Sequence, residues 1–331
     1  MRKITRALGA IHLIPDRAYL KLAYRLEFGE KLDLEEPATF NQKLQWLKLN
    51  GATFRFSHLA DKAQARDYVE KVLGPRYLVP LLGLYDDPKQ IPWHALPAQF
   101  VAKCTHGSHC GVVCRDPAQF SPRAAQRKLR KWMRRSWYWF GREPVYLGIR
   151  PQVMVEKYLG LAGQPPMDYK VMCFNGEPRV VQVHQKVAGG HAITFYDVDG
   201  ERLGLGKAGY PITGPKRLAE DLLKQLLPAA RKLAQSVDTP YLRTDFYWLQ
   251  GHLLFSELTF FDSSGFKAFT PEGADLWLGK LLRLDPMTCP RCGGRMKWRT
   301  IMGSRWCDKV ERYDQCPSCG HQRRVDMESS S

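Results

Sequence analysis

Two apolar stretches near residue 250 carry charged residues in their interiors, and this feature constrains the fold most. The segment at 241–261, YLRTDFYWLQGHLLFSELTFF, places Arg243, Asp245 and Glu257 among aromatic and aliphatic residues. Two such stretches around Gln250-Gly251 predict a β-hairpin. A charge inside an apolar strand is unfavourable unless a partner or a ligand binds it. The hairpin therefore predicts a polar site on one face of a sheet.

The length of the hairpin loop decides which side chains share a face, because side chains alternate along a strand. A three-residue loop places Asp245 opposite Glu257. It also places Arg243 opposite Thr259, so that all four side chains point to one face. A two-residue loop at Gln250-Gly251 would instead point the carboxylates to opposite faces. Paired carboxylates suit Mg²⁺ beside phosphate, and the alternative is rim carboxylates paired with Arg243.

Length and composition indicate a globular protein of two or three domains. The chain has 331 residues, of which 44% are hydrophobic and 11% aromatic, which supports a sizeable core. Its apolar runs are too short to span a bilayer, and the N-terminal segment lacks the pattern of a secretory signal. We therefore expect a cytoplasmic protein whose nine cysteines are thiols or metal ligands instead of disulfides.

The chain is strongly basic, with a formal net charge of +17. Its densest basic run extends from Arg123 to Arg135 and contains no acidic residue. This run predicts an anionic partner, which is a nucleic acid, a membrane surface or an acidic polymer. The alternative is a solvated helix face beside Leu129, Trp132 and Met133.

Periodicity and turn residues predict four parts, namely a helical segment at 1–75, an α+β body at 76–286, a metal-binding tail at 287–325 and a disordered end at 326–331. The segment 59–74 is expected to form one helix that ends at Gly74-Pro75. The dipeptides Asn175-Gly176 and Asp199-Gly200 indicate hairpin turns. The expected strands are 77–87, 99–104, 152–159, 168–178, 179–187 and 192–200, and the expected later helices are 123–135, 218–237 with a kink at Pro228, and 274–284.

A strand at 99–104 leads into a loop of small residues that suits phosphate. Lys103 stands at its end and is followed by Thr105, Gly107 and Ser108. Glycine lets backbone N–H groups approach phosphate oxygens, the hydroxyls add donors, and the lysine supplies charge. The loop is not a Walker A motif, because no Gly-Lys-Ser/Thr sequence ends it. Its cysteines and histidines leave a metal site as an alternative, although they contain no Cys-x-x-Cys pair.

A second strand end, at 156–159, carries Glu156, Lys157, Tyr158 and Leu159. Its backbone could serve an adenine edge, and its carboxylate an amino group or a ribose. The alternative is an ordinary strand end with paired surface charges. The next expected strand opens with Asp168-Tyr169-Lys170.

Taken in order, these motifs resemble the ATP-grasp superfamily, and specifically the TupA-like ATP-grasp proteins linked to teichuronopeptide and other cell-surface polysaccharide biosynthesis. The resemblance extends over residues 12–284 and includes PATFNQKLQWLKL, KCTHGS, YWFGREPVY and SELTFFDSSGF. It implies an α+β, ATP-grasp fold in which two α+β subdomains clamp ATP between antiparallel sheets. A smaller N-terminal domain precedes them.

The resemblance implies an ATP site built from all of these motifs. Lys103 would neutralise the α- and β-phosphates, and the loop at 105–111 would cover them. The strand end at 156–159 would contact adenine, and Asp168 would reach the ribose. The expected ATP-binding residues are Lys103, Thr105, Gly107, Ser108, Glu156, Lys157, Tyr158, Leu159 and Asp168.

The implied reaction is ATP-dependent carboxylate–amine ligation through an acylphosphate. Lys170 would lie on the γ-phosphate side, and Arg243 would stabilise the transferred phosphoryl group. Asp245, Glu257 and Thr259 would hold Mg²⁺.

Two positions depart from the family pattern. Thr259 stands where relatives have asparagine, and because it is a poorer ligand we expect one well-held magnesium ion. His109-Cys110-Gly111 replaces Gly-Gly-Asn in the phosphate loop, which stiffens the loop and alters its closure over ATP.

The tail carries two cysteine pairs outside the resemblance. Cys289 and Cys292 form one Cys-x-x-Cys motif, and Cys316 and Cys319 form another, each followed by glycine. This spacing predicts a tetrahedral Zn²⁺ site in a structural zinc ribbon, with a hairpin between the pairs. Such a short segment needs its metal to fold.

Two functions follow from these predictions. The first is a carbon–nitrogen ligase that joins a carboxylate substrate to an amine acceptor on an anionic glycan or peptide, at the inner face of the membrane. The second is a catalytically degenerate ATP-grasp protein that binds nucleic acid or a protein partner through its basic surface and zinc ribbon.

Overall fold

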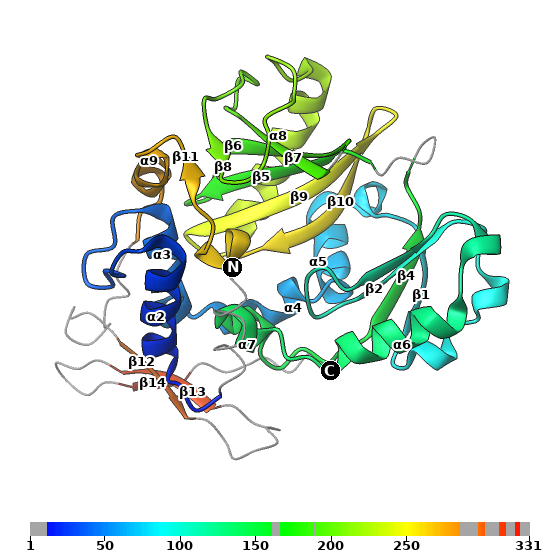
Figure 1. Ribbon diagram of the computed structural model, residues 1–331, viewed down its shortest axis with the longest axis horizontal. Coiled ribbons are helices and arrows are strands. Elements are labelled where there is room, and N and C mark those ends of the chain that lie inside the picture. Colours follow the sequence, from blue (N-terminus) through cyan, green and yellow to red (C-terminus); the bar gives the residue numbers. More distant parts are fainter. Residues whose placement is uncertain are drawn as a thin grey trace.

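The computed structural model describes residues 12–160, 166–188 and 190–284, and three strands in the tail at 297–301, 311–315 and 322–324. Two antiparallel sheets form the body, and helices from the N-terminal part of the chain lie beside them (Figure 1).

The smaller sheet has four antiparallel strands in the order β1-β4-β2-β3. Alternate residues of β2, Phe100, Ala102 and Cys104, are buried on one face together with Leu129 of helix α6. The alternation leaves Val101 and Lys103 on the opposite face. The elements are β1 (Leu81–Tyr85), β2 (Phe100–Cys104), β3 (Gly111–Cys114), β4 (Val153–Lys157) and α6 (Pro122–Met133).

The larger sheet has five antiparallel strands in the order β10-β9-β5-β6-β7. Helix α8 contacts this sheet and runs through Pro228 without ending there. Asn175 and Gly176 both have positive φ between β5 and β6, which confirms the turn expected there. The elements are β5 (Asp168–Phe174), β6 (Glu177–Val187), β7 (Gly190–Tyr196), β9 (Tyr241–Leu249), β10 (His252–Thr259) and α8 (Glu220–Ser236).

The N-terminal helices share one hydrophobic core with the larger sheet. The Phe40 ring, at the start of α3, lies 5.7 Å from that of Phe174 and 5.0 Å from that of Tyr241. The Thr39 side chain and Gln42 form a capping box that fixes the beginning of α3. The helices are α2 (Asp16–Phe28), α3 (Phe40–Asn50), α4 (Ser57–Ala60) and α5 (Gln64–Leu73).

The single helix expected at 59–74 is wrong, because the chain breaks between α4 and α5. The Asp61 carboxylate accepts hydrogen bonds from the backbone N–H groups of Ala63 and Gln64, at 2.8 and 3.1 Å. An aspartate that accepts such bonds starts a new helix instead of continuing the previous one. The break places Lys62 at the junction of the two helices.

The hairpin has the two-residue turn, and it still gives the pairing that the three-residue loop would produce. Gln250 and Gly251, both with positive φ, form a two-residue turn, because His252 pairs with Leu249. The register then shifts between Phe255 and Glu257, where Ser256 is the extra residue of a β-bulge. Beyond the bulge, Asp245 pairs with Glu257 and Arg243 pairs with Thr259. The bulge therefore restores the shared face that the two-residue turn alone would remove.

The remaining elements complete the body and part of the tail. No helix among the described residues is long and apolar enough to cross a membrane. In the tail, β12 pairs with β13, which confirms the expected hairpin. The four tail cysteines lie outside the described residues. The elements are α7 (Tyr138–Gly141), α9 (Ala274–Leu281), β8 (Gly206–Lys207), β11 (Phe269–Thr270), β12 (Lys297–Ile301), β13 (Glu311–Gln315) and β14 (Gln322–Arg324).

Short 3₁₀ helices connect several of these elements. They are η1 (Thr53–Phe56), η2 (Pro75–Tyr77), η3 (Pro88–Gln90), η4 (Trp93–Ala95), η5 (Pro117–Gln119), η6 (Pro144–Tyr146) and η7 (Asp262–Gly265).

Candidate active site

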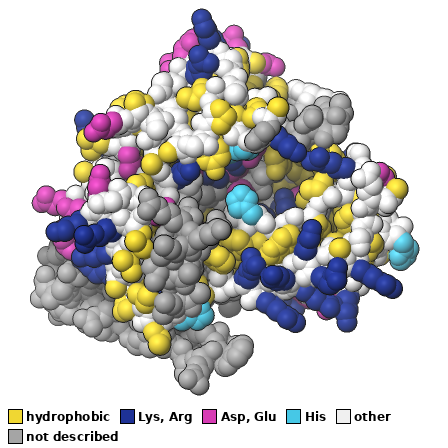
Figure 2. Space-filling model, viewed as in Figure 1, with side chains coloured by type: hydrophobic (Ala, Val, Ile, Leu, Met, Phe, Trp, Pro, Cys, Tyr) yellow, Lys and Arg dark blue, Asp and Glu magenta, His cyan; other side chains and the backbone are white. Residues whose placement is uncertain are grey.

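A cleft of about 540 Å³ lies between the two sheets, and Figure 2 shows the molecule hollowed there. The smaller sheet lines it with residues of β2, β3 and β4, and the larger sheet with residues of β5, β6, β7 and β9. Six of the residues expected to bind ATP line this cleft, namely Lys103, Glu156, Lys157, Tyr158, Leu159 and Asp168. Lining residues that the sequence did not single out include Arg115, His184, Lys186, His191 and Tyr247.

Lys103 and Glu156 form an ion pair across neighbouring strands of the smaller sheet. The Lys103 Nζ lies 2.6 Å from Glu156 Oε2, and Arg66 Nη1 of α5 lies 2.8 Å from Glu156 Oε1. Burial alone would lower the pKa of Lys103, but the charge and hydrogen bond of Glu156, together with the charges of Tyr247 and Glu257, outweigh burial and raise this pKa above its ordinary value. Lys103 is therefore held as a cation at the wall of the cleft.

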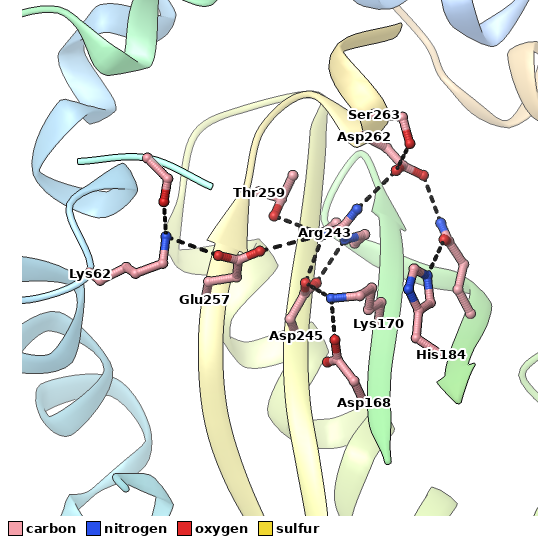
Figure 3. A network of polar contacts seen from close by, with 12 residues as sticks. Lys62, Asp168, Lys170, His184, Arg243, Asp245, Glu257, Thr259, Asp262 and Ser263 are labelled. Carbon is pink, nitrogen blue, oxygen red and sulfur yellow. Dashed lines mark hydrogen bonds and ion pairs between the residues drawn. The ribbon is translucent and has the colours of Figure 1, made fainter. Parts of the chain in front are cut away.

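A second group, here called the Arg243 cluster, lies on the face of the larger sheet (Figure 3). It consists of Lys170, Arg243, Asp245, Glu257 and Asp262. Arg243 donates from Nε to Asp245 Oδ1 and from Nη2 to Asp245 Oδ2, both at 2.7 Å, which is a bidentate pair. Its Nη1 donates to Asp262 Oδ1 at 2.9 Å, and its Nη2 lies 3.8 Å from Glu257 Oε1. One guanidinium thus holds three carboxylates.

Lys170 connects this cluster to the cleft. Its Nζ contacts Asp245 and lies 2.6 Å from Asp168 Oδ2, and Asp168 lines the cleft. Burial would lower the pKa of Lys170, but the charges of Asp168 and Asp245 raise it well above its ordinary value. Burial, with the nearby charges of Asp245 and Glu257, raises the pKa of Asp168.

The two expected metal ligands differ in access. The Asp245 side chain is 0% exposed, whereas 24% of the Glu257 side chain is exposed. Burial would raise the pKa of Glu257, but the charges of Lys62, Lys170 and Arg243 hold it well below its ordinary value. The Thr259 hydroxyl oxygen accepts a hydrogen bond from Arg243 Nη2 at 3.1 Å. Glu257 is therefore the ionised carboxylate that a ligand reaches first.

Lys62 was not expected in the site. Its Nζ lies 3.1 Å from Glu257 Oε2 and donates to the Gly107 carbonyl at 2.8 Å. It therefore connects the metal-ligand strand to the phosphate loop. Asp61 is a residue type that favours a helix start, so the sequence could indicate the helix break but not the contact of Lys62 with the site.

A polar network extends from the Arg243 cluster to the rim of the cleft. Lys207 Nζ lies 2.8 Å from Asp262 Oδ1, and Gln182 Nε2 donates to Asp262 Oδ2 at 2.7 Å. His191 Nε2 lies 3.1 Å from His184 Nδ1, and His184 Nε2 lies 3.2 Å from Gln182 Oε1. Neither Asp262 nor these histidines stand in a motif whose spacing indicates a site.

The phosphate loop is packed at its base. Thr105 is buried, and its hydroxyl accepts a hydrogen bond from the backbone N–H of Gln152 at 3.3 Å. A side chain at Gly107 would place its Cβ 2.1 Å from the Trp137 indole nitrogen, so only glycine fits there. Thr105, Gly107 and Ser108 do not line the cleft, whereas Lys103 does.

The residues of the Arg243 cluster fit a magnesium ion by their chemistry. Mg²⁺ is usually bound through one or two carboxylates and completes its shell with water and phosphate oxygens. Asp245 and Glu257 are paired across adjacent strands. A metal site made of protein side chains alone is a different case: the described residues contain no group of three or more His, Cys, Asp or Glu arranged for one. The cluster thus suits a metal that arrives with a phosphate ligand.

The comparison with solved structures finds distant similarities. The ATP-grasp ligase PsnB in complex with a precursor variant, Mg and ADP is 14% identical with a TM-score of 0.36, covering 66% of this chain and 58% of that chain. D-alanine–D-alanine ligase from Bacillus anthracis with ATP is 11% identical with a TM-score of 0.36, covering 62% and 55%. L-amino acid ligase from Bacillus licheniformis is 14% identical with a TM-score of 0.43, covering 76% and 56%. The chain thus spans less than two thirds of each of these proteins.

No curated protein matches the chain. The model of the TupA-like ATP-grasp family matches residues 42–283. This match covers most of the chain and contains both sheets and every residue of the cleft and of the Arg243 cluster. The chain therefore belongs to the TupA-like ATP-grasp family.

Proposed function

We propose that this protein is an ATP-dependent carboxylate–amine ligase. One observation supports this proposal above all others, namely that the Lys103–Glu156 pair lines a cleft between two antiparallel sheets and that the Arg243 cluster reaches this cleft through the contact of Lys170 with Asp168. Such a cleft provides a binding site for a nucleotide, with a buried group of charged residues beside it. A protein that only binds a macromolecule has no need for buried cations at such a place.

The chain's residues suit the two chemical steps of this reaction. In the first step a substrate carboxylate oxygen attacks the γ-phosphorus of ATP, and the bond to the ADP oxygen breaks. Lys103 and Lys170 neutralise the triphosphate, and Arg243 neutralises the transferred phosphoryl group. In the second step an amine attacks the acyl carbon, phosphate leaves, and the amine loses a proton. No side-chain nucleophile is required, so positioning and charge carry the catalysis.

Glu257 and Asp245 would hold the magnesium ion, which supplies charge neutralisation at the phosphates when bound. Because Glu257 is the exposed carboxylate of the two, we assign it as the primary ligand. Asp245 then keeps Arg243 and Lys170 in place as much as it binds metal. The Thr259 hydroxyl already accepts a hydrogen bond from Arg243, which supports the binding of one magnesium ion instead of two.

The experiment is an assay of ADP release with purified protein and a panel of amino acids and uronic-acid acceptors. We expect a substrate-dependent rate that Glu257→Ala and Asp245→Ala abolish. Lys224→Ala is the control, because among the described residues Lys224 pairs with the exposed Glu220 alone. ATP binding without turnover for any substrate, or no ATP binding with retained nucleic-acid binding, would contradict the ligase and favour a degenerate binding protein.

We further propose that the substrates are an anionic glycan or peptide precursor of the cell surface, and that the protein meets them at the cytoplasmic face of the membrane. The basic helix α6 supports an anionic acceptor, and Figure 2 shows Lys and Arg side chains gathered over it. Binding to vesicles with and without anionic lipid tests the location. Equal binding to both would contradict it.

We propose that Cys289, Cys292, Cys316 and Cys319 bind a structural Zn²⁺ ion. The spacing of the cysteines supports this, as does the hairpin of β12 and β13 between the two pairs. Metal analysis of the full-length protein should find one zinc per chain, and Cys316→Ser with Cys319→Ser should release it. Unchanged zinc content in this variant would contradict the assignment.

A further inference from the structure

A second cavity lies on the outer side of the smaller sheet, between the edge strand β3 and helix α6. We call it the α6 groove, and its volume is about 600 Å³. Strand β3 supplies Gly111, Val112 and Val113, and α6 supplies cationic and aromatic residues. The complete lining is Gly111, Val112, Val113, Gln119, Phe120, Ser121, Ala124, Ala125, Lys128, Lys131, Trp132 and Arg135.

The charged lining is entirely positive. Lys128 and Lys131 are three residues apart on α6, which places them on one face of the helix, and Arg135 lies two residues beyond the helix end at Met133. The lining contains no carboxylate. Among the described residues no ion pair involves these three side chains, whereas Arg130 on the same helix pairs with Asp87 at 3.2 Å. The groove is therefore complementary to an anion.

The opposite wall of the groove is a strand with an open edge. In its sheet β3 pairs with β2 alone. The Cys104 N–H donates to the Cys110 carbonyl at 2.8 Å, so this pair is hydrogen-bonded. Hydrogen-bonded and non-hydrogen-bonded pairs alternate along an antiparallel ladder. The backbone groups of Gly111 and Val113 therefore point away from β2 and toward the open edge, where an extended chain can pair with them.

We propose that the α6 groove binds an extended acidic polypeptide by strand addition to β3. In an extended chain alternate side chains face the same way, about 7 Å apart. Lys128 and Lys131 are about 4.5 Å apart along the helix axis, and their long side chains can spread to reach successive carboxylates. Trp132 and Phe120 offer apolar surface to the side-chain stems. A glycan or a nucleic acid lacks the backbone N–H and C=O groups that match β3.

The C-terminal end of α6 leads toward the active site. The carbonyl of Arg135 lies 3.2 Å from His106 Nε2 of the phosphate loop, and Val113 lines both the groove and the cleft. A chain seated in the groove therefore has one end beside the phosphate loop. Its role as the amine acceptor rests on the proposed ligase function, whereas its binding does not.

Calorimetric titration of the full-length protein without ATP tests this inference with four probes. They are a peptide of about ten glutamates, the same peptide N-methylated at alternate residues, an oligogalacturonate of equal charge and a short single-stranded DNA. We expect the unmodified peptide to bind most tightly, and N-methylation to weaken it about tenfold, because the methyl groups remove donors without changing charge. Equal binding of both peptides would overturn strand addition, and tighter binding of the glycan or DNA would assign the groove to that class.

Two double variants distinguish peptide binding in the groove from a general attraction between the peptide and the basic surface. We expect Lys128→Gln with Lys131→Gln to weaken the peptide about tenfold. Arg127→Gln with Arg134→Gln removes the same charge from exposed positions of the same basic run outside the groove and should change affinity less than about twofold. Equal losses, or no peptide binding to the wild type, would overturn the proposal. ADP release is measured separately, so failure of the ligase leaves this result interpretable.

Discussion

The Arg243 cluster and the basic run of α6 both gather cations, but they differ in how those cations are balanced. Around Arg243, the cations Lys62, Lys170 and Lys207 each contact a carboxylate, and the group is largely buried. On α6, only Arg130 forms an ion pair among the described residues. A buried charge must be paired inside the protein, whereas an exposed charge is balanced by solvent ions or by a partner. The charges of the cluster are therefore part of the fold, whereas the cations on the α6 face can bind an anionic partner.

The largest effect is expected when the centre of the cluster is removed. Arg243→Met leaves Asp245 and Asp262 buried without their shared partner, which should destabilise the fold by about 3 to 5 kcal/mol. Chemical denaturation monitored by circular dichroism measures this loss. Lys224→Met, in an exposed pair with Glu220, is the control and should leave the midpoint unchanged. A similar midpoint for both variants would mean that the cluster is not part of what holds the fold.

The next effect separates the two carboxylates. Glu257→Gln should reduce kcat on the order of 100-fold with little change in Tm, because this side chain is partly exposed. Asp245→Asn should lower both kcat and Tm, because Arg243 and Lys170 lose a buried partner. Turnover assays and differential scanning fluorimetry of the two variants make the comparison. Equal losses of Tm would contradict the different burial of the two groups.

A smaller effect is expected from pH. Burial, followed by the charges of Lys170, Arg243 and Lys207 and opposed by Asp262, holds the pKa of His184 far below its ordinary value of 6.5. Below pH 6.5 the unfolded chain binds a proton that the folded chain does not bind. The free energy of unfolding should therefore decrease as the pH is lowered below 6.5, by up to about 1.4 kcal/mol per pH unit.

The control for this pH effect is His184→Gln, which removes the imidazole and keeps a polar side chain. Between pH 7.5 and pH 5.5 the Tm of the wild type should fall more than that of this variant. Parallel changes in Tm would show that His184 is not the group responsible.

The smallest effect on stability is expected on α6. Lys128→Gln with Lys131→Gln should change the free energy of unfolding by less than about 0.5 kcal/mol, since neither side chain is buried or paired. Urea denaturation of the double variant at low and high salt measures it. A destabilisation as large as that of Arg243→Met would show that the α6 face serves the fold and not a partner.

The sequence predicted both strands of the hairpin and the pairing of Asp245 with Glu257, but for an incorrect reason. The buried residues of β10 are Leu253 and Phe255 before the bulge, and Leu258 after it. This change from odd to even positions is what an inserted residue produces, but the apolar Leu254 obscures it in the sequence.

Other parts of the site could not be predicted from local patterns. Lys62 and Asp262 reach the cluster from segments far from the hairpin in sequence, and only the tertiary fold brings them together. The α6 helix was predicted from its periodicity. The groove beside it required knowledge that β3 is an edge strand, which depends on the order of strands in the sheet.

The bulge at Ser256 has a consequence for comparing homologues. A relative that lacked this single residue and kept the two-residue turn would place its glutamate directly opposite the Asp245 position in a regular ladder. A relative that kept the residue but paired without the bulge would instead place the glutamate opposite the Thr244 position, and its side chain would project from the other side of β10. Within this family, a one-residue gap at Ser256 is therefore compatible with an intact pair of carboxylates.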